Sequence, residues 1–123
     1  MVEKFSSSAD FACVYIAEAH PAEKRHFGGN YDIETHKAFD DRFKAANVFV
    51  REFDELLRSK FASLKDVEVP TFVDLMADEA NKKYAALPER LFGVIGGKIG
   101  YAGDLGPYGY DIDAVEEWIQ KVA

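Results

Sequence analysis

Two residues suited to acid–base chemistry follow the most apolar segment of this 123-residue chain. Residues 11–17 form a continuous apolar run, and Glu18 and His20 come directly after it. If the run is a buried strand, both side chains lie on one side of its carboxyl end, where ligand sites of open α/β sheets gather. A carboxylate beside an imidazole favours the protonated imidazole, which is suited to donating a proton. The alternative is a histidine that merely caps a strand.

Cys13 is the only thiol in the chain and therefore invites interpretation as a nucleophile. It lies in the middle of the apolar run, where burial is expected to raise the pKa of its thiol, so we interpret it as a core residue. One thiol and three scattered histidines do not make a structural zinc site, and no bound cofactor is predicted. A single cysteine favours a reducing compartment such as the cytoplasm.

The composition predicts one acidic globular domain. The chain is 48% hydrophobic and 14% aromatic, which is enough for one core. Its net charge of -7, without a cluster of Lys and Arg, argues against binding to nucleic acid. The longest apolar run is too short to span a membrane, and residues 1–10 lack the hydrophobic segment of a signal peptide.

The first half of the chain predicts a strand, a loop and a long helix. The run at residues 11–17 does not alternate, which is typical of a parallel strand covered on both faces. The glycines and charges of residues 21–33 predict a solvated loop that contains His26. From residue 34 to residue 64, apolar residues recur at steps of three and four, which predicts an amphipathic helix. They are Phe39, Phe43, Ala46, Val50, Phe53, Leu57, Phe61 and Leu64.

The second half predicts shorter elements. Residues 69–74 are β-branched and contain a proline, which suits an edge strand, and residues 74–84 suit a short helix. Residues 90–95 and 98–102 flank Gly96-Gly97, a two-residue loop whose glycines can adopt the positive φ of a hairpin turn.

A last helix is predicted near the carboxyl end of the sequence. Asp113, followed by Glu116 three residues later, resembles a capping box. One face of this helix carries Val115, Trp118, Ile119 and Val122. The order strand, helix, strand, helix, hairpin, helix predicts the α/β class.

Three stretches, taken together, resemble the iodothyronine deiodinase family. They are Val14-Tyr15-Ile16-Ala17-Glu18-Ala19-His20, Asp74-Leu75-Met76 and Tyr84-Ala85-Ala86-Leu87-Pro88-Glu89-Arg90-Leu91. The spacing to Gly97-Lys98-Ile99, Tyr101 and Gly106-Pro107 matches as well, so the resemblance covers roughly residues 11–122. It implies a single domain over residues 1–123 with a thioredoxin-like three-layer α/β fold, close to that of the peroxiredoxins.

The resemblance also implies an activity, the reductive removal of iodine from thyroid hormone. In the family, a selenolate or thiolate attacks the iodine of an iodinated phenolic substrate, and a thiol reductant restores the nucleophile. By this resemblance Glu18 and His20 become the acid pair of the active site.

Two further site residues are carried over by the resemblance. His36 matches a histidine expected to contact the hormone, with a surface histidine as the alternative. Arg90 follows Pro88 at the start of a strand, where thioredoxin-like folds place a cis-proline beside the nucleophile. Its guanidinium would stabilise a thiolate or selenolate. A salt bridge to Glu89 or Asp74 is the alternative for Arg90.

The family's first central strand and nucleophile loop are not expected within these residues, because residues 1–7 already match the helix that follows the loop. The family's tryptophan shortly after its histidine is missing too, and residues 51–68 form a lengthened helical segment. We therefore expect the chain to be inactive by itself. The alternatives are a non-catalytic interaction subunit and a peroxiredoxin-like thiol enzyme.

An absent central strand would leave a gap between residues 11–17 and residues 90–95. Each edge would then carry unpaired backbone groups, which are costly when buried. Three outcomes are predicted: another segment or chain supplies the strand, the two edges close on each other, or the lone chain folds poorly. Donation of the strand between copies of the chain would make a homo-oligomer.

Overall fold

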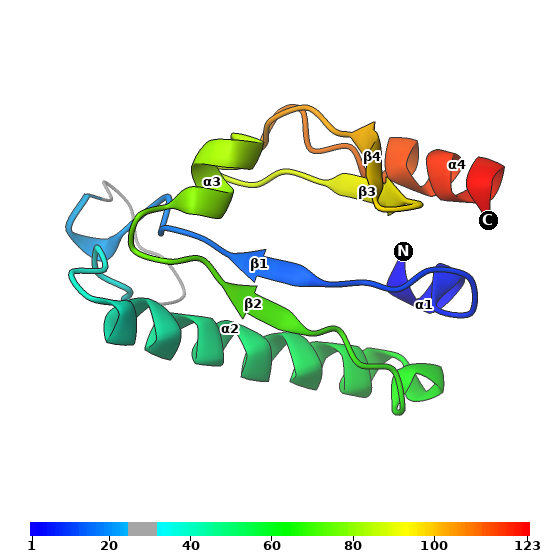
Figure 1. Cartoon of the computed structure of the whole chain (residues 1–123). Coiled ribbons are helices and arrows are strands. Elements are labelled where there is room, and N and C mark those ends of the chain that lie inside the picture. The colour runs from blue at the N-terminus through cyan, green and yellow to red at the C-terminus, as the bar shows by residue number, and fades with distance from the viewer. Residues whose placement is uncertain (25–31) are drawn as a thin grey trace.

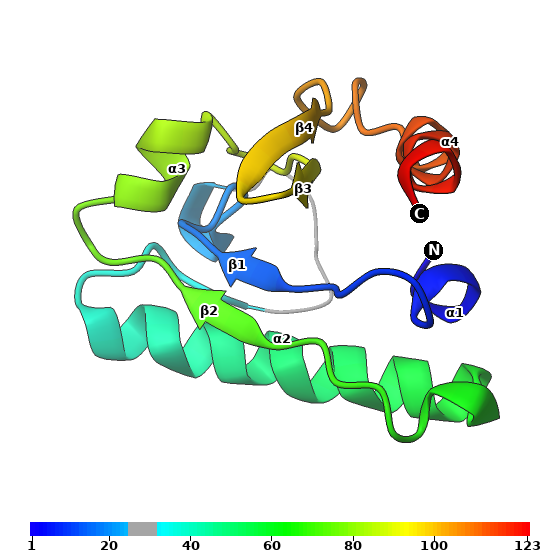
Figure 2. The same ribbon diagram turned by 45° about the vertical axis from the view of Figure 1, so that its right-hand side comes forward.

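One long helix packs against a parallel strand pair, and a β-hairpin and the last helix lie beyond the first strand of that pair (Figure 1). The structure is a computed structural model that describes residues 1–24 and 32–123. Figure 2 shows the same layers from a second direction. The mixed arrangement confirms the predicted α/β class. His26, in the predicted loop, lies outside the described residues.

The parallel pair consists of β1 (Cys13–Tyr15) and β2 (Thr71–Val73). Val14 lies opposite Phe72 in the register of the pair. The prediction that the first strand is covered on both faces is wrong for this structure, because Val14 is 52% exposed. Only the face that carries Cys13 and Tyr15 is partly buried, so the second face of the strand has no layer on it among the described residues.

The long helix α2 (Phe39–Lys60) begins five residues later than predicted and is followed by a 3₁₀ turn, η2 (Ala62–Leu64). The delay has a local cause, because the Asp41 carboxylate accepts hydrogen bonds from the backbone N–H groups of Lys37 and Ala38, both at 3.0 Å. These bonds satisfy donors that a helix start leaves free. The remaining short helices at the start of the chain are α1 (Val2–Phe5) and η1 (Ala22–Lys24).

The buried face of α2 differs from the predicted stripe. Phe39 and Phe43 are exposed, whereas Ala45 and Ala46 are buried and Arg42 is 2% exposed, with its guanidinium against the segment after β2. The prediction fails at this end because hydrophobic periodicity does not count a buried guanidinium, and each of the three nitrogens of Arg42 has a polar partner.

The hairpin confirms its prediction. β3 (Phe92–Ile95) pairs antiparallel with β4 (Lys98–Ala102), with a bulge after Gly93. Gly96 and Gly97 have φ values of 58° and 74°, as a two-residue hairpin loop requires.

The helix before the hairpin, α3 (Glu79–Tyr84), begins later than predicted. Asp74, the predicted first residue, lies outside it and accepts hydrogen bonds from the backbone N–H groups of Ala80 and Asn81. The peptide bond between Leu87 and Pro88 is cis.

The last helix, α4 (Ile112–Val122), is capped by Asp111 and not by Asp113. The Asp111 carboxylate accepts from the backbone N–H of Ala114 at 3.0 Å, so the helix starts two residues earlier than a cap at Asp113 would allow. Val115 and Ile119 are buried against Phe5 of α1, as the predicted apolar face requires. Trp118 packs against the same cluster, whereas Val122 is exposed.

Gly93 gives a direct test of the packing between the hairpin and α4. A Cβ atom at Gly93 would overlap the six-membered ring of Trp118. We expect Gly93→Ala to lower the free energy of unfolding by about 1–3 kcal/mol, because the indole must move out of its place. Urea denaturation measures the change. The substitution should cost clearly less in a Trp118→Leu background, and an equal cost there would contradict the close contact.

A groove of about 750 Å³, here called the inter-sheet groove, separates β1 from the hairpin. Its walls include Phe11, Val14, Ile16, Phe92, Ile95 and Trp118. Among the described residues, no strand pairs with the free edge of β1 or with the free edge of β3. Direct closure of the two edges, one of the predicted outcomes, is therefore not what the structure shows.

Candidate functional site

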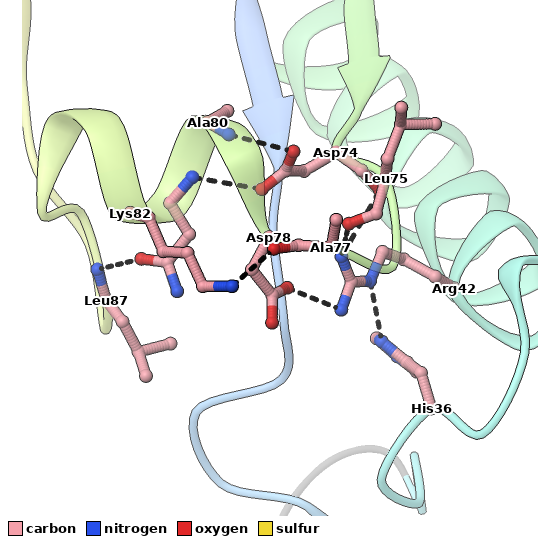
Figure 3. A network of polar contacts seen from close by, with 10 residues as sticks. His36, Arg42, Asp74, Leu75, Ala77, Asp78, Ala80, Lys82 and Leu87 are labelled. Carbon is pink, nitrogen blue, oxygen red and sulfur yellow. Dashed lines mark hydrogen bonds and ion pairs between the residues drawn. The ribbon is translucent and has the colours of Figure 1, made fainter.

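Arg42 lies at the centre of a polar network that joins α2 to the segment after β2 (Figure 3). Its Nη1 donates to the backbone carbonyl oxygens of Asp74, at 3.2 Å, and Leu75, at 2.7 Å. Its Nη2 forms an ion pair of 2.9 Å with the Asp78 carboxylate, and its Nε donates to His36 Nδ1 at 3.3 Å. The guanidinium is thus fixed from three sides.

Asp74 connects this network to α3. Burial raises the pKa of the Asp74 carboxyl, but hydrogen bonds from the N–H groups of Asn81 and Ala80 outweigh it, and the resulting pKa lies below the usual value. The carboxylate therefore stays ionised near neutral pH. It holds the start of α3 next to the carbonyl groups that Arg42 contacts.

His36, the predicted substrate-binding histidine, lies in the segment before α2 and not in its first turn, and it is 8% exposed. Burial lowers the pKa of His36, and the neighbouring Arg42 guanidinium lowers it further. No described residue supplies a hydrogen-bond partner for the buried His36 Nε2. A buried polar group left unsatisfied in this way costs about 1–3 kcal/mol. The residue also borders a second hollow, of about 370 Å³, with Asp41 and Lys44.

The lowered pKa of His36 predicts how stability depends on pH. The unfolded chain, with an ordinary histidine pKa of 6.5, binds a proton more readily than the folded chain. This contribution to stability is therefore complete above that value and is lost as the pH falls from it towards the lower folded pKa. We expect urea unfolding at about pH 7.5 and about pH 5.5 to show a smaller difference for His36→Asn than for the parent chain. An unchanged difference would contradict a neutral His36.

Tyr15 and Glu18 form a pair at the carboxyl end of β1. The Tyr15 hydroxyl donates to Glu18 Oε2 at 2.9 Å. Burial raises the pKa of Tyr15, and the Glu18 carboxylate raises it further. The ring of Tyr15 lies 6.1 Å from that of His36. Tyr15 thereby brings the predicted residues Glu18 and His36 into one neighbourhood.

His20 is exposed and is not joined to Glu18 by a hydrogen bond or an ion pair in the described part of the chain. The predicted acid pair is therefore near in sequence but not in contact. Glu18 instead has Tyr15 as its partner.

Arg90 lies on the wall of the inter-sheet groove. Its Nε donates to the carbonyl oxygen of Gly103 at 2.7 Å, and its Nη1 donates to that of Tyr84 at 3.1 Å. Its guanidinium carbon lies 5.2 Å from the centre of the Phe92 ring. These contacts hold its charge beside the groove, which the other three predicted site residues do not line. These contacts differ from the salt bridge to Glu89 or Asp74 that the alternative interpretation of Arg90 predicts.

Cys13 is half-buried in β1. Burial raises the pKa of its thiol, and the Thr71 side chain lowers it by a smaller amount. A thiol with a raised pKa is mostly protonated at neutral pH and is a poor nucleophile. Within residues 1–24 and 32–123, no three His, Cys, Asp or Glu side chains are placed to hold a metal ion, and no helix is long and apolar enough to cross a membrane.

The fold and this network define an α/β domain with ionisable side chains near the carboxyl ends of a parallel strand pair. The family model for iodothyronine deiodinase matches residues 1–123, and the chain belongs to the iodothyronine deiodinase family, a family of oxidoreductases.

Curated relatives support the assignment. The chain is similar to type I iodothyronine deiodinase of Xenopus laevis, with 36% identity over 98% of the chain and 43% of the relative. Type II iodothyronine deiodinases of Rattus norvegicus and Homo sapiens are 34% and 32% identical, again over 98% of the chain, and over 43% and 42% of the relatives. The chain thus spans less than half the length of the relatives it matches.

Sequence reasoning missed Arg42 and did not assign Tyr15 a role. Arg42 has a detectable signal, because it precedes the buried Ala45 and Ala46 by three and four residues and so shares their helix face. Tyr15 faces the same side of β1 as Cys13, two residues away, which places it on the partly buried face.

Proposed function

We propose that this chain is the larger part of a redox domain that removes iodine from an iodinated thyronine. Its nucleophile, a selenolate or thiolate, belongs to a segment outside these 123 residues. The main support is membership of the iodothyronine deiodinase family over the whole chain. The relatives are more than twice as long as the matched region, so such a segment has a place in proteins of this kind.

The proposed domain has a thioredoxin-like fold in which the outside segment adds a strand in the inter-sheet groove. The free edges of β1 and β3 border that groove, and its walls are largely apolar. An added strand would pair with backbone N–H and C=O groups that otherwise have only solvent as a partner. It would also cover Val14 and Val94, which are 52% and 65% exposed.

The proposed chemistry uses Arg90 at the wall of this groove and His20, which follows the carboxyl end of β1. The chalcogen anion forms a bond to iodine while the carbon–iodine bond breaks. The electron pair of the broken bond remains on the ring carbon. A proton from an acid such as His20 then gives the carbon–hydrogen bond. Two thiol equivalents reduce the chalcogen–iodine bond, which yields iodide, a disulfide and the restored nucleophile. Arg90, held at the groove wall, stabilises the chalcogen anion.

An iodide-release assay with a dithiol reductant tests the proposal. The longest native form of the protein, which contains the nucleophile, is expected to release iodide from an iodothyronine. Neither the 123-residue chain nor the longer form with its nucleophile changed to alanine should do so. Release by the short chain that disappears in Cys13→Ser would overturn the proposal.

A second candidate function is a non-catalytic interaction subunit, and the raised pKa of Cys13 favours it for the 123 residues alone. Complete inactivity of the longest native form towards iodothyronines would support that candidate. Peroxide consumption by the same form would instead indicate a peroxiredoxin-like thiol enzyme.

A further inference from the structure

The contact between Arg42 and His36 determines which imidazole nitrogen carries the proton. A guanidinium has only donors, so the Nδ1 atom that accepts from Arg42 Nε at 3.3 Å must present its lone pair. A neutral imidazole with a free Nδ1 carries its hydrogen on Nε2. We propose that Arg42 is a positioning residue that holds His36 as the neutral Nε2–H tautomer, so that this N–H can donate to an acceptor atom of the substrate.

The environment of Arg42 keeps its Nε in place. The other guanidinium nitrogens contact two carbonyl groups and the Asp78 carboxylate, all in the segment that leads to α3 (Figure 3). Turning Nε away from His36 would break these contacts together. A lysine at this position would keep the charge but not the planar arrangement of donors. The role therefore depends on the shape of arginine as well as on its charge.

The Nε2 atom of His36 indicates a ligand. Buried polar groups in proteins nearly always have a hydrogen-bond partner, and Nε2 has none in the described part of the chain. A substrate acceptor would satisfy it. The charged and titratable groups that act on His36 come from several elements: Arg42 and Asp41 of α2, Glu18 and Tyr15 at β1, and Asp78 before α3. Burial and Arg42 together outweigh the carboxylates and keep the ring neutral.

The substrate part of this inference rests on the proposed deiodinase function, whereas the tautomer part does not. Nitrogen-15 spectra of the histidine side chains in the longest native form of the protein test the tautomer directly. We expect one imidazole, assigned by its loss in His36→Asn, to be protonated at Nε2 alone at neutral pH. Protonation of His36 at Nδ1, or an even mixture of tautomers, would overturn the proposal.

Kinetics of iodide release test whether Arg42 acts through His36. In Arg42→Lys the imidazole should exchange between tautomers, and KM should rise about tenfold with a smaller change in kcat. His36→Asn, which can still accept from Arg42 but lacks the Nε2–H, should show a similar rise. The double variant should be no worse than the poorer single variant.

The matched control is Arg51→Lys, the same change at an exposed position of α2, which should leave both the spectrum and KM unchanged. Multiplication of the two single effects in the double variant would show that Arg42 acts independently of His36 and would overturn the proposal. If the parent protein releases no iodide, the proposed function fails, and the spectra still decide the tautomer. If Arg42→Lys does not fold, the spectra of the parent protein still decide the tautomer of His36.

Discussion

Replacement of Arg42 by methionine is expected to lower the free energy of unfolding by about 3 kcal/mol, the largest effect of any single substitution considered. Methionine has a similar length but cannot donate. The change would remove the donors of the carbonyl groups of Asp74 and Leu75 and of the Asp78 carboxylate. Because Arg42 is 2% exposed, water cannot easily replace it. Urea denaturation followed by circular dichroism gives the measurement.

The control for this substitution lies on the same helix. Arg51 forms a long ion pair of 3.7 Å with Glu52, and its side chain is largely exposed. We expect Arg51→Met to change stability by less than about 0.5 kcal/mol. Similar effects of the two substitutions would show that the network around Arg42 does not hold α2 to the rest of the domain.

Local turn and strand patterns were predictable because they depend on few residues. Gly96 and Gly97 adopt positive φ, which other residues rarely do, and the hairpin forms around them as expected. The strand at residues 71–73 agrees with its prediction, since β-branched residues favour strands and proline is tolerated at the start or edge of a sheet.

Helix boundaries and caps were less predictable because several acidic residues compete for the same role. Asp111 and Asp113 both lie near the start of the last helix, and only the hydrogen bond to Ala114 identifies Asp111 as the cap. At α2, the Asp41 carboxylate selects the start, so residues 34–38 remain outside the helix. The consequence reaches the candidate site, because His36 is free to approach the side chain of Arg42.

The candidate site itself was predictable in part. Its residue types could be named from the sequence, but their partners could not. Glu18 lies closer in sequence to His20 than to Tyr15, and yet its hydrogen bond is with Tyr15. The burial of Arg42 depends on carbonyl groups more than thirty positions away, which no local pattern contains. Such contacts are set by tertiary packing and not by spacing along one element.

The inter-sheet groove leads to the prediction with the largest expected change, which is in the hydrogen-exchange rates of backbone amides. In β1, Cys13 N–H donates to the carbonyl of Pro70, and the carbonyl of Tyr15 accepts from Asp74 N–H. Backbone direction alternates along a strand, so the N–H groups of Val14 and Ile16 point to the groove side. In the 123-residue chain these two amides are expected to exchange rapidly with solvent, whereas Cys13 is protected.

A strand in the groove would reverse this pattern at Val14 and Ile16. In the longest native form their hydrogen exchange is expected to slow by a factor on the order of a thousand or more, because exchange would then require the domain to unfold. Cys13 should change less, since it is paired in both forms. The measurement separates strand addition from a merely tighter fold, which would slow all three amides alike. Full protection of Val14 and Ile16 in a proven monomer of the short chain would remove the reason to place a strand there.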